Sequence, residues 1–298
     1  MNMLYRLTLR NIKVFVKDRA TLFFSLLSPL IILLLNLLFL RNMQINNLIF
    51  HAGDYVERAV LARIVDGYMF AGIISISCIT VAFSCAMIRV KDSEIGSKDD
   101  LIVAPIKSYM IDISYWLAAF VITFLICLLV LISAFVFLIA NGGSFSVMEI
   151  IIGILALFVA TLSASAFVTF ILRFFKTLNA ASAFVGIISA LGGFIIGAYM
   201  PVSTFALPVQ NVMNSVPASH ATAIFRNVFL TNAIGEVREL AGYQIADLIT
   251  TNYDLSLNFF GGLANLSVQW IYLIVSIFVF VGLSVFIYYF KKSKKTSN

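Results

Sequence analysis

The chain contains 298 residues, of which 61% are hydrophobic and only 11% are charged, and its formal net charge is +6. Its mean hydropathy is +1.03. A typical soluble domain is about 45–50% apolar and about 25% charged, so this composition excludes an ordinary water-soluble domain. Long uncharged runs recur along nearly the whole sequence, and they favour one helical bundle over the two soluble domains that the length alone would suggest.

Residues 1–20 are predicted to form an amphipathic helix that lies along the membrane surface. At about 100° per residue, four basic side chains fall within about 60° of arc, and apolar residues occupy the other faces. Such a basic stripe is typical of an interfacial helix. Two roles remain open: contact with anionic lipid, or docking of a partner protein. The basic residues are Arg6, Arg10, Lys13 and Lys17.

Six uncharged segments are long enough to cross a membrane as helices. A bilayer core of about 30 Å requires about 20 predominantly apolar residues in a helix. Because the runs do not alternate polar with apolar residues, helices are predicted rather than barrel strands. The predicted fold class is an all-α integral membrane protein, in which residues 1–298 form a single transmembrane domain. The predicted spans are 22–40, 67–88, 116–140, 150–171, 180–199 and 270–290.

The distribution of Lys and Arg predicts how these spans are oriented. If both termini are cytoplasmic, 15 of the 20 Lys and Arg residues lie on the cytoplasmic side. Cytoplasmic loops of membrane proteins carry an excess of these residues. We therefore expect a multi-pass protein of the plasma (cytoplasmic) membrane, of bacterial type, with both termini in the cytoplasm.

The inner loop, residues 89–112, is the most polar stretch between spans. It places mixed charges beside a short apolar segment that ends near Pro105. This pattern predicts a short cytoplasmic helix that presents a surface to another protein. A plain solvated loop is the alternative.

The fifth predicted span is rich in small residues at four-residue spacing. Small residues at this spacing let two helices approach closely and often mark a packing seam. The seam could form within one chain or between two chains, and the sequence leaves both open. The first row is Ser182, Gly186 and Ala190, and the second is Ser189, Gly193 and Gly197.

The outer segment, residues 200–269, contains Pro201, Pro208 and Pro217 among apolar residues. It is too apolar for a free loop, and its prolines interrupt it too often for a membrane-spanning helix. Irregular backbone at membrane depth is tolerated only where it is packed in protein. The segment is therefore predicted to form re-entrant or surface-packed helices before the last span.

No catalytic or metal site is predicted. The sequence lacks the G-x-x-x-x-G-K-[ST] pattern of a P-loop, and we find no grouped nucleophile, acid/base pair or Cys/His cluster. The predicted spans also lack the carboxylates that ion-coupled transporters use. The chain is therefore not expected to be an enzyme, and any energy for transport must come from another chain.

Taken together, these segments resemble the membrane-spanning permease subunit of type-2 ABC exporters (the ABC-2 permease family). Three stretches carry the resemblance and cover most of the chain. The N-terminal stretch contains Arg10, Asn11, Phe15, Asp18, Arg19, Leu22, Phe23, Phe24 and Pro29. The inner-loop stretch contains Glu94, Gly96, Leu101, Ala104, Pro105 and Ile106. The outer stretch contains Gly197, Met200, Pro201, Pro208, Pro217 and Arg226.

The resemblance implies the partners and the coupling residues. It implies two copies of an ABC ATPase that carry ATP and Mg, a second permease as a homo- or heterodimer, and contact with membrane lipid but not with nucleic acid. No cofactor is expected in this chain. The second and fifth spans would line the central path, and the interfacial helix would lie beside the ATPase. The coupling residues would be Glu94, Gly96, Asp99, Leu101 and Pro105.

The resulting functional prediction is a permease subunit of an ATP-driven exporter. The outer stretch 235–254 is longer than in polymer-exporting members, so an amphipathic drug, toxin or peptide, or lipid-like substrate is expected. The alternative is an ATP-independent channel or scaffold subunit.

Overall fold

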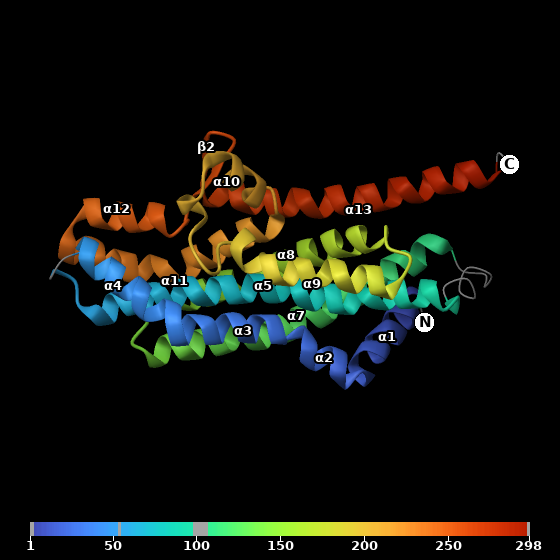
Figure 1. Cartoon of the computed structure of the whole chain (residues 1–298), viewed down its shortest axis with the longest axis horizontal. Helices are drawn as coiled ribbons and strands as arrows, with labels where there is room; N and C mark the ends of the chain where they lie inside the picture. The colour runs from blue at the N-terminus through green and yellow to red at the C-terminus, as the bar shows by residue number, and fades with distance from the viewer. Residues whose placement is uncertain (1–2, 53–54, 98–106, 297–298) are drawn as a thin grey trace.

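The computed structural model describes residues 3–52, 55–97 and 107–296, which form an elongated helical bundle (Figure 1). Within these ranges, six helical segments are long and apolar enough to cross a membrane, which confirms the predicted all-α fold with six spans. The helices are α1 (Met3–Lys17), α2 (Arg19–Ser25), α3 (Leu27–Leu35), a π-helical turn (Asn36–Leu40), α4 (Arg41–Ala52), α5 (Arg58–Glu94), α7 (Ser108–Ala140), α8 (Val147–Leu172), α9 (Leu178–Ile195), a 3₁₀ turn (Val202–Thr204), α10 (Leu207–Asn214), α11 (Pro217–Ala241), α12 (Tyr243–Asn252) and α13 (Leu266–Thr296).

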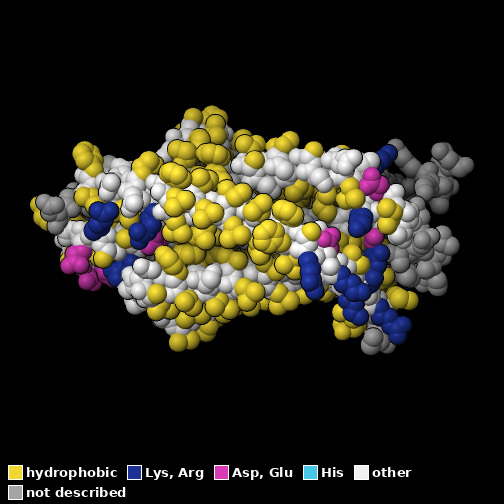
Figure 2. Space-filling model, turned by 60° about the horizontal axis from the view of Figure 1, so that its bottom comes forward, with side chains coloured by type: hydrophobic (Ala, Val, Ile, Leu, Met, Phe, Trp, Pro, Cys, Tyr) yellow, Lys and Arg dark blue, Asp and Glu magenta, His cyan; other side chains and the backbone are white. Residues whose placement is uncertain are grey.

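The bundle has two ends, which we name after the helices that lie there. The α1 end contains α1, the end of α5, the start of α7 and the junction of α8 with α9 (Figure 1). The α12 end contains α4, α12 and the second half of α11 (Figure 1). Figure 2 shows hydrophobic side chains across the middle of the visible face and charged side chains toward both ends, which is the distribution that a membrane requires.

The first span is bent near its start. Helices α2 and α3 meet at Leu26, and Pro29 explains the break. A proline has no N–H to donate to the carbonyl four residues earlier, which here is that of Ser25. The start of α2 is well defined, because the Asp18 carboxylate accepts a hydrogen bond from the Thr21 N–H at 3.0 Å.

Helix α5 lies at the centre of the bundle and is buried along most of its length. Four of the other spanning helices, α3, α7, α8 and α9, pack against it, as does α11. One contact requires a glycine, because a Cβ on Gly72 would lie 2.7 Å from the Cβ of Ala198. The central position of α5 means that residues at its two ends can contact most other elements.

The segment before the last span differs from the all-α prediction in one detail. Strands β1 (Leu257–Phe259) and β2 (Gly262–Ala264) form an antiparallel hairpin. Phe260 and Gly261 connect them, both with positive φ (46° and 82°). Such a two-residue turn matches the twist of antiparallel strands, and Gly261, which adopts a positive φ without steric cost, is its sequence signal.

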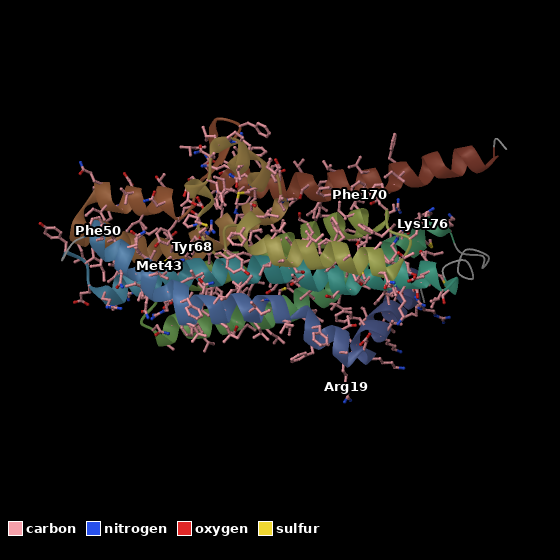
Figure 3. The ribbon with its side chains drawn as sticks, viewed as in Figure 1. Arg19, Met43, Phe50, Tyr68, Phe170 and Lys176 are labelled. Atoms are coloured by element: carbon pink, nitrogen blue, oxygen red, sulfur yellow. The ribbon has the colours of Figure 1, made fainter. Side chains whose placement is uncertain are left out.

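A buried ion pair holds this segment on the bundle. Arg226 of α11 contacts Asp254 (Nη1–Oδ2 3.3 Å) and donates to the Gly197 carbonyl at 2.7 Å. Its guanidinium lies 4.3 Å from the centre of the Tyr68 ring on α5, in the bundle interior (Figure 3). Burial raises the pKa of Asp254, and Arg226 opposes this increase. We call these four residues the Arg226 cluster; it joins α5, the end of α9, α11 and the segment after α12.

Replacement of Asp254 by Asn should lower the unfolding temperature of the purified protein in detergent. The change leaves the Arg226 guanidinium buried without a counter-charge, which costs about 3–5 kcal/mol. Asn tolerates the positive φ of 52° at this position, so the backbone is not expected to contribute.

The matched control is Asp247→Asn. Asp247 pairs with Arg238 at 3.8 Å on the surface, where its side chain is 70% exposed, and such pairs contribute about 0–1 kcal/mol. Equal unfolding temperatures for the two variants would contradict the assigned role of the Arg226 cluster.

Candidate functional site

At the α1 end, a carboxylate near the end of α5 joins three helices. Asp92 accepts two hydrogen bonds from the Arg10 guanidinium of α1, one of them at 3.2 Å, and one from the Tyr115 hydroxyl of α7 at 2.6 Å. The Asp92 side chain is only 6% exposed. The hydrogen bond to Asp92 raises the pKa of Arg10, against the effect of burial. These residues, the Arg10 cluster, attach the N-terminal helix to the bundle.

A second charged cluster lies nearby, with side chains from α5, α7 and the end of α8 and a backbone contact to α13. Asp112 of α7 accepts from Arg89 of α5 (Nε–Oδ1 3.3 Å) and from Arg173 at the end of α8. Arg173 also donates to the Ser284 carbonyl of α13. Burial lowers the pKa of Arg173, and Asp112 opposes this decrease, but a guanidinium stays charged at neutral pH. We call Arg89, Asp112 and Arg173 the Arg173 cluster; it carries one excess positive charge.

The last turn of α5 contacts the start of α9 directly. The Glu94 carboxylate accepts a hydrogen bond from the Leu178 N–H at 2.9 Å. The first N–H groups of a helix lack partners within the helix and carry partial positive charge, so a carboxylate stabilises them. Gly96 follows with φ +80°, which lets the chain turn away directly after this contact.

The structure describes two of the five predicted coupling residues. Glu94 and Gly96 lie at the end of α5, where the chain enters the inner loop. Asp99, Leu101 and Pro105 lie outside the described residues.

The four basic residues of the predicted stripe on α1 differ in their surroundings. Arg6, Lys13 and Lys17 are exposed, whereas Arg10 turns toward the bundle and pairs with Asp92. Arg19, at the start of α2, points away from the bundle (Figure 3). Figure 2 shows a concentration of Lys and Arg side chains at this end. The exposed charges form a basic surface, and Arg10 is a structural contact.

A cavity of about 550 Å³ lies at the α1 end between α1, α2, α5 and α9. Phe24, Met87 and Val185 give it apolar walls, and Asp18 and Lys91 place opposite charges on it. Serine side chains complete its lining at Ser84, Ser182 and Ser189. The cavity can therefore accept a molecule with both apolar and polar parts.

A second cavity, of about 440 Å³, lies at the α12 end of the same helices. It is lined by α4, by the segment after α9 and by α12. Gln44, Asn47 and Asn252 supply amide groups, and Met43 and Tyr199 supply apolar surface. The predicted outer residues Pro201, Pro208 and Pro217 lie close by in sequence: Pro201 lines this cavity, and the other two begin α10 and α11. The two cavities thus lie at opposite ends of the side of the bundle formed by the first span and α9.

The two rows of small residues in α9 have different surroundings. Ser182, Gly186 and Ala190 are exposed, and no atom lies within 4 Å of a Cβ built on Gly186. Gly193 and Gly197 are buried: a Cβ on Gly193 would lie 2.2 Å from Cε2 of Tyr199. The second row is therefore a packing seam within the chain, and the first row is an unoccupied surface of the single chain.

Several residues of this region were not singled out in the sequence. The sequence pattern assigned no contact or function to Arg89, Arg173, Asp92, Asp112 or Tyr115. Their position in the sequence could have identified them. Each lies at or near an end of a long apolar helix, where an unpaired charged residue would be costly and a partner is therefore expected. In the described ranges, no group of three or more His, Cys, Asp and Glu residues is placed to hold a metal ion.

Comparison with known proteins identifies the family. Residues 58–286, most of the chain, match the ABC-2 family transporter protein family. No curated protein matches the sequence. The matched range begins with α5 and ends within α13, so it covers five of the six spans and the whole Arg173 cluster, but not Arg10 of α1. The chain therefore belongs to the ABC-2 transporter family, as the membrane-spanning permease subunit that partners an ABC ATPase.

Proposed function

We propose that the chain is the permease of an ATP-driven exporter, with the α1 end in the cytoplasm. The excess of Lys and Arg at this end supports the orientation. The observation that carries the proposal is the contact between Glu94 and Leu178, because it links the residues that enter the inner loop to the start of α9.

The proposed coupling works through this contact. Closure of two ATPase subunits on ATP would displace the inner loop, and therefore the last turn of α5. Because Glu94 binds the first turn of α9, the displacement reaches a helix that lines the α1-end cavity. A partner can bias a two-state equilibrium only through contacts that differ between the states, and this hydrogen bond is the proposed differential contact.

The cavity suggests the class of substrate. Its walls combine aromatic and aliphatic side chains with serines and a few charges. This lining suits an amphipathic drug, toxin-like peptide or lipid-like molecule, and it lacks the extended polar surface that a carbohydrate polymer requires.

A second permease is proposed to cover the exposed side of α9. The first span, α9 and α13 all have few buried residues in the single chain, so the choice of α9 rests on its exposed small residues. Ser182 and Gly186 border the α1-end cavity, and at Ala190, beyond it, the row of small residues allows another helix to approach closely. With the partner in place, the two cavities would face a central path between two permeases.

The first test is affinity purification of the tagged chain from its native membrane in mild detergent. The proposal expects a stoichiometric P-loop ATPase that hydrolyses ATP in the complex. Its reproducible absence, together with ATP-independent conduction in vesicles, would instead support the channel or scaffold alternative.

Replacement of Glu94 by Ala should uncouple the complex. Coupling between sites corresponds typically to about 1–3 kcal/mol, so the difference in ATP hydrolysis rate between the complex and the free ATPase should shrink about fivefold or more. ATP hydrolysis by the purified complex measures this effect. The amount of ATPase that co-purifies should stay the same, because Glu94 is expected to transmit movement and not to hold the subunits together.

Glu57→Ala is the matched control. Glu57 is an exposed acid at the opposite end of α5, and its side chain makes no capping hydrogen bond. The coupling role of Glu94 is refuted if both variants hydrolyse ATP at the rate of the unmodified complex.

A photo-crosslinking residue at Ala190 should capture the second permease. Ala190 is exposed on the predicted seam, and a close helix–helix contact would place it within reach of the neighbouring chain. The cross-linked product is measured by mass in native membranes, which distinguishes a second copy from a different permease. The control position is Phe278, which is 73% exposed on α13. Equal yields of protein adducts at both positions would contradict the seam.

A further inference from the structure

A third cavity lies away from the proposed transport path. It is a groove of about 260 Å³ between α7, α8 and α13 at the α1 end. Ile113 and Trp116 of α7, Ala166 of α8, and Val281 and Val285 of α13 form its mostly apolar walls. None of the residues that line it belongs to either transport cavity. We call it the α13 groove.

The shape of the bundle explains why the groove exists. Helix α13 packs on α8 and α11, and Phe280 contacts Phe167 and Phe170 of α8, with ring centres 5.1 and 5.7 Å apart. Phe170 lies on α8 beneath α13 in Figure 3. Toward its C-terminal end, α13 extends beyond the other helices (Figure 1). The groove therefore lies along the side of the bundle, at the level where the α1 end leaves the membrane.

The end of the groove carries positive charge. Arg173 and Asp112 line it, and Arg89 binds the same carboxylate, so the three side chains sum to one positive charge. Arg173 uses one hydrogen on each terminal nitrogen, for Asp112 and for the Ser284 carbonyl. A guanidinium has five N–H donors, so Arg173 retains capacity for another acceptor.

Two further polar groups lie about one helical turn deeper in the groove. Trp116 follows Asp112 by four residues on α7, and Thr169 precedes Arg173 by four residues on α8, which is about 6 Å along each helix. The Trp116 Nε1 and Thr169 Oγ1 atoms are buried and have no hydrogen-bond partner among the described residues. Leaving such groups unpaired is costly, so a small side-chain rotation that turns them toward an acceptor in the groove would be favourable.

We propose that the α13 groove binds an anionic phospholipid of the cytoplasmic leaflet. The groove has a guanidinium at one end, two hydrogen-bond donors about one helical turn from it, and apolar walls along its length. A phospholipid presents the matching order of phosphate, ester carbonyls and acyl chain. Charge complementarity with Arg173 favours an anionic headgroup, and the apolar walls require the acyl chain, which a free phosphate lacks.

The proposed site touches residues that join four helices. A phosphate at Arg173 would share this guanidinium with Asp112 and thus act on the contact between Asp112 and Arg89 of α5. Lipid composition would then affect the α1 end of the bundle directly. This inference does not depend on the identity of the transported substrate.

The test is native mass spectrometry of the full-length chain in detergent micelles, with phosphatidylglycerol or phosphatidylcholine added. Unmodified protein should bind phosphatidylglycerol about tenfold more tightly, as expected for a charge-assisted contact. A soluble headgroup, sn-glycerol 3-phosphate, should not compete, because it lacks the acyl chain.

Two variants probe the groove. Trp116→Phe removes one N–H and keeps a large ring, so it should weaken phosphatidylglycerol binding about fivefold. Val281→Trp should fill the groove and abolish the preference for phosphatidylglycerol. Val279→Trp is the control, because Val279 is 46% exposed on α13 and does not line the groove.

Two results would overturn the proposal. One is equal affinity of the unmodified protein for the two lipids. The other is unchanged phosphatidylglycerol binding by Trp116→Phe, whatever the effect of Val281→Trp. Failure of either kind leaves the proposed transport function untouched, because the transport test uses ATP hydrolysis and a different cavity.

Discussion

The charges near the two ends of α5 can be buried only because groups on other helices pair with them. Asp66 binds the Arg41 guanidinium through contacts of 2.6 and 2.9 Å, and Asp92 binds Arg10 and Tyr115. Removing one partner of a buried pair costs about 3–5 kcal/mol. Helices α1, α4 and α7 are therefore tied to α5 at these points, and they are expected to move with it as one body.

Helix α9 is attached to this body in a different way. Its buried side consists of small residues such as Ala181, Gly192 and Gly193, and no charged residue lies within it. Its start is bound by Glu94, and the turn after its end by Arg226. Small apolar contacts between two anchored ends permit a limited shift or rotation more easily than buried ion pairs do. Both proposed transport cavities adjoin α9 or the segment that follows it, so such a shift would change their width.

The sequence predicted the all-α fold with six spans, because a run of about 20 apolar residues has few other stable arrangements. It predicted the contacts between spans less well. The arc of Arg6, Arg10, Lys13 and Lys17 was correctly placed on one helix, but helical periodicity carries no information about the Asp92 carboxylate that turns Arg10 inward. Likewise, spacing could not distinguish the buried Gly193 from the exposed Gly186, because the difference depends on the turn that returns Tyr199 onto α9.

The short connection from α8 to α9 links the proposed sites. It begins with Arg173, which borders the α13 groove, and ends just before Leu178, which binds Glu94. Between them, Phe175 packs on Phe184 of α9, with ring centres 5.1 Å apart, so the connection is held against the helix that it precedes. A displacement of either anchor is therefore transmitted to the same turn. The ATPase would act on this turn through α5, and the lipid would act on it through Arg173. Because both inputs bias one element, each is expected to alter the effect of the other at the start of α9.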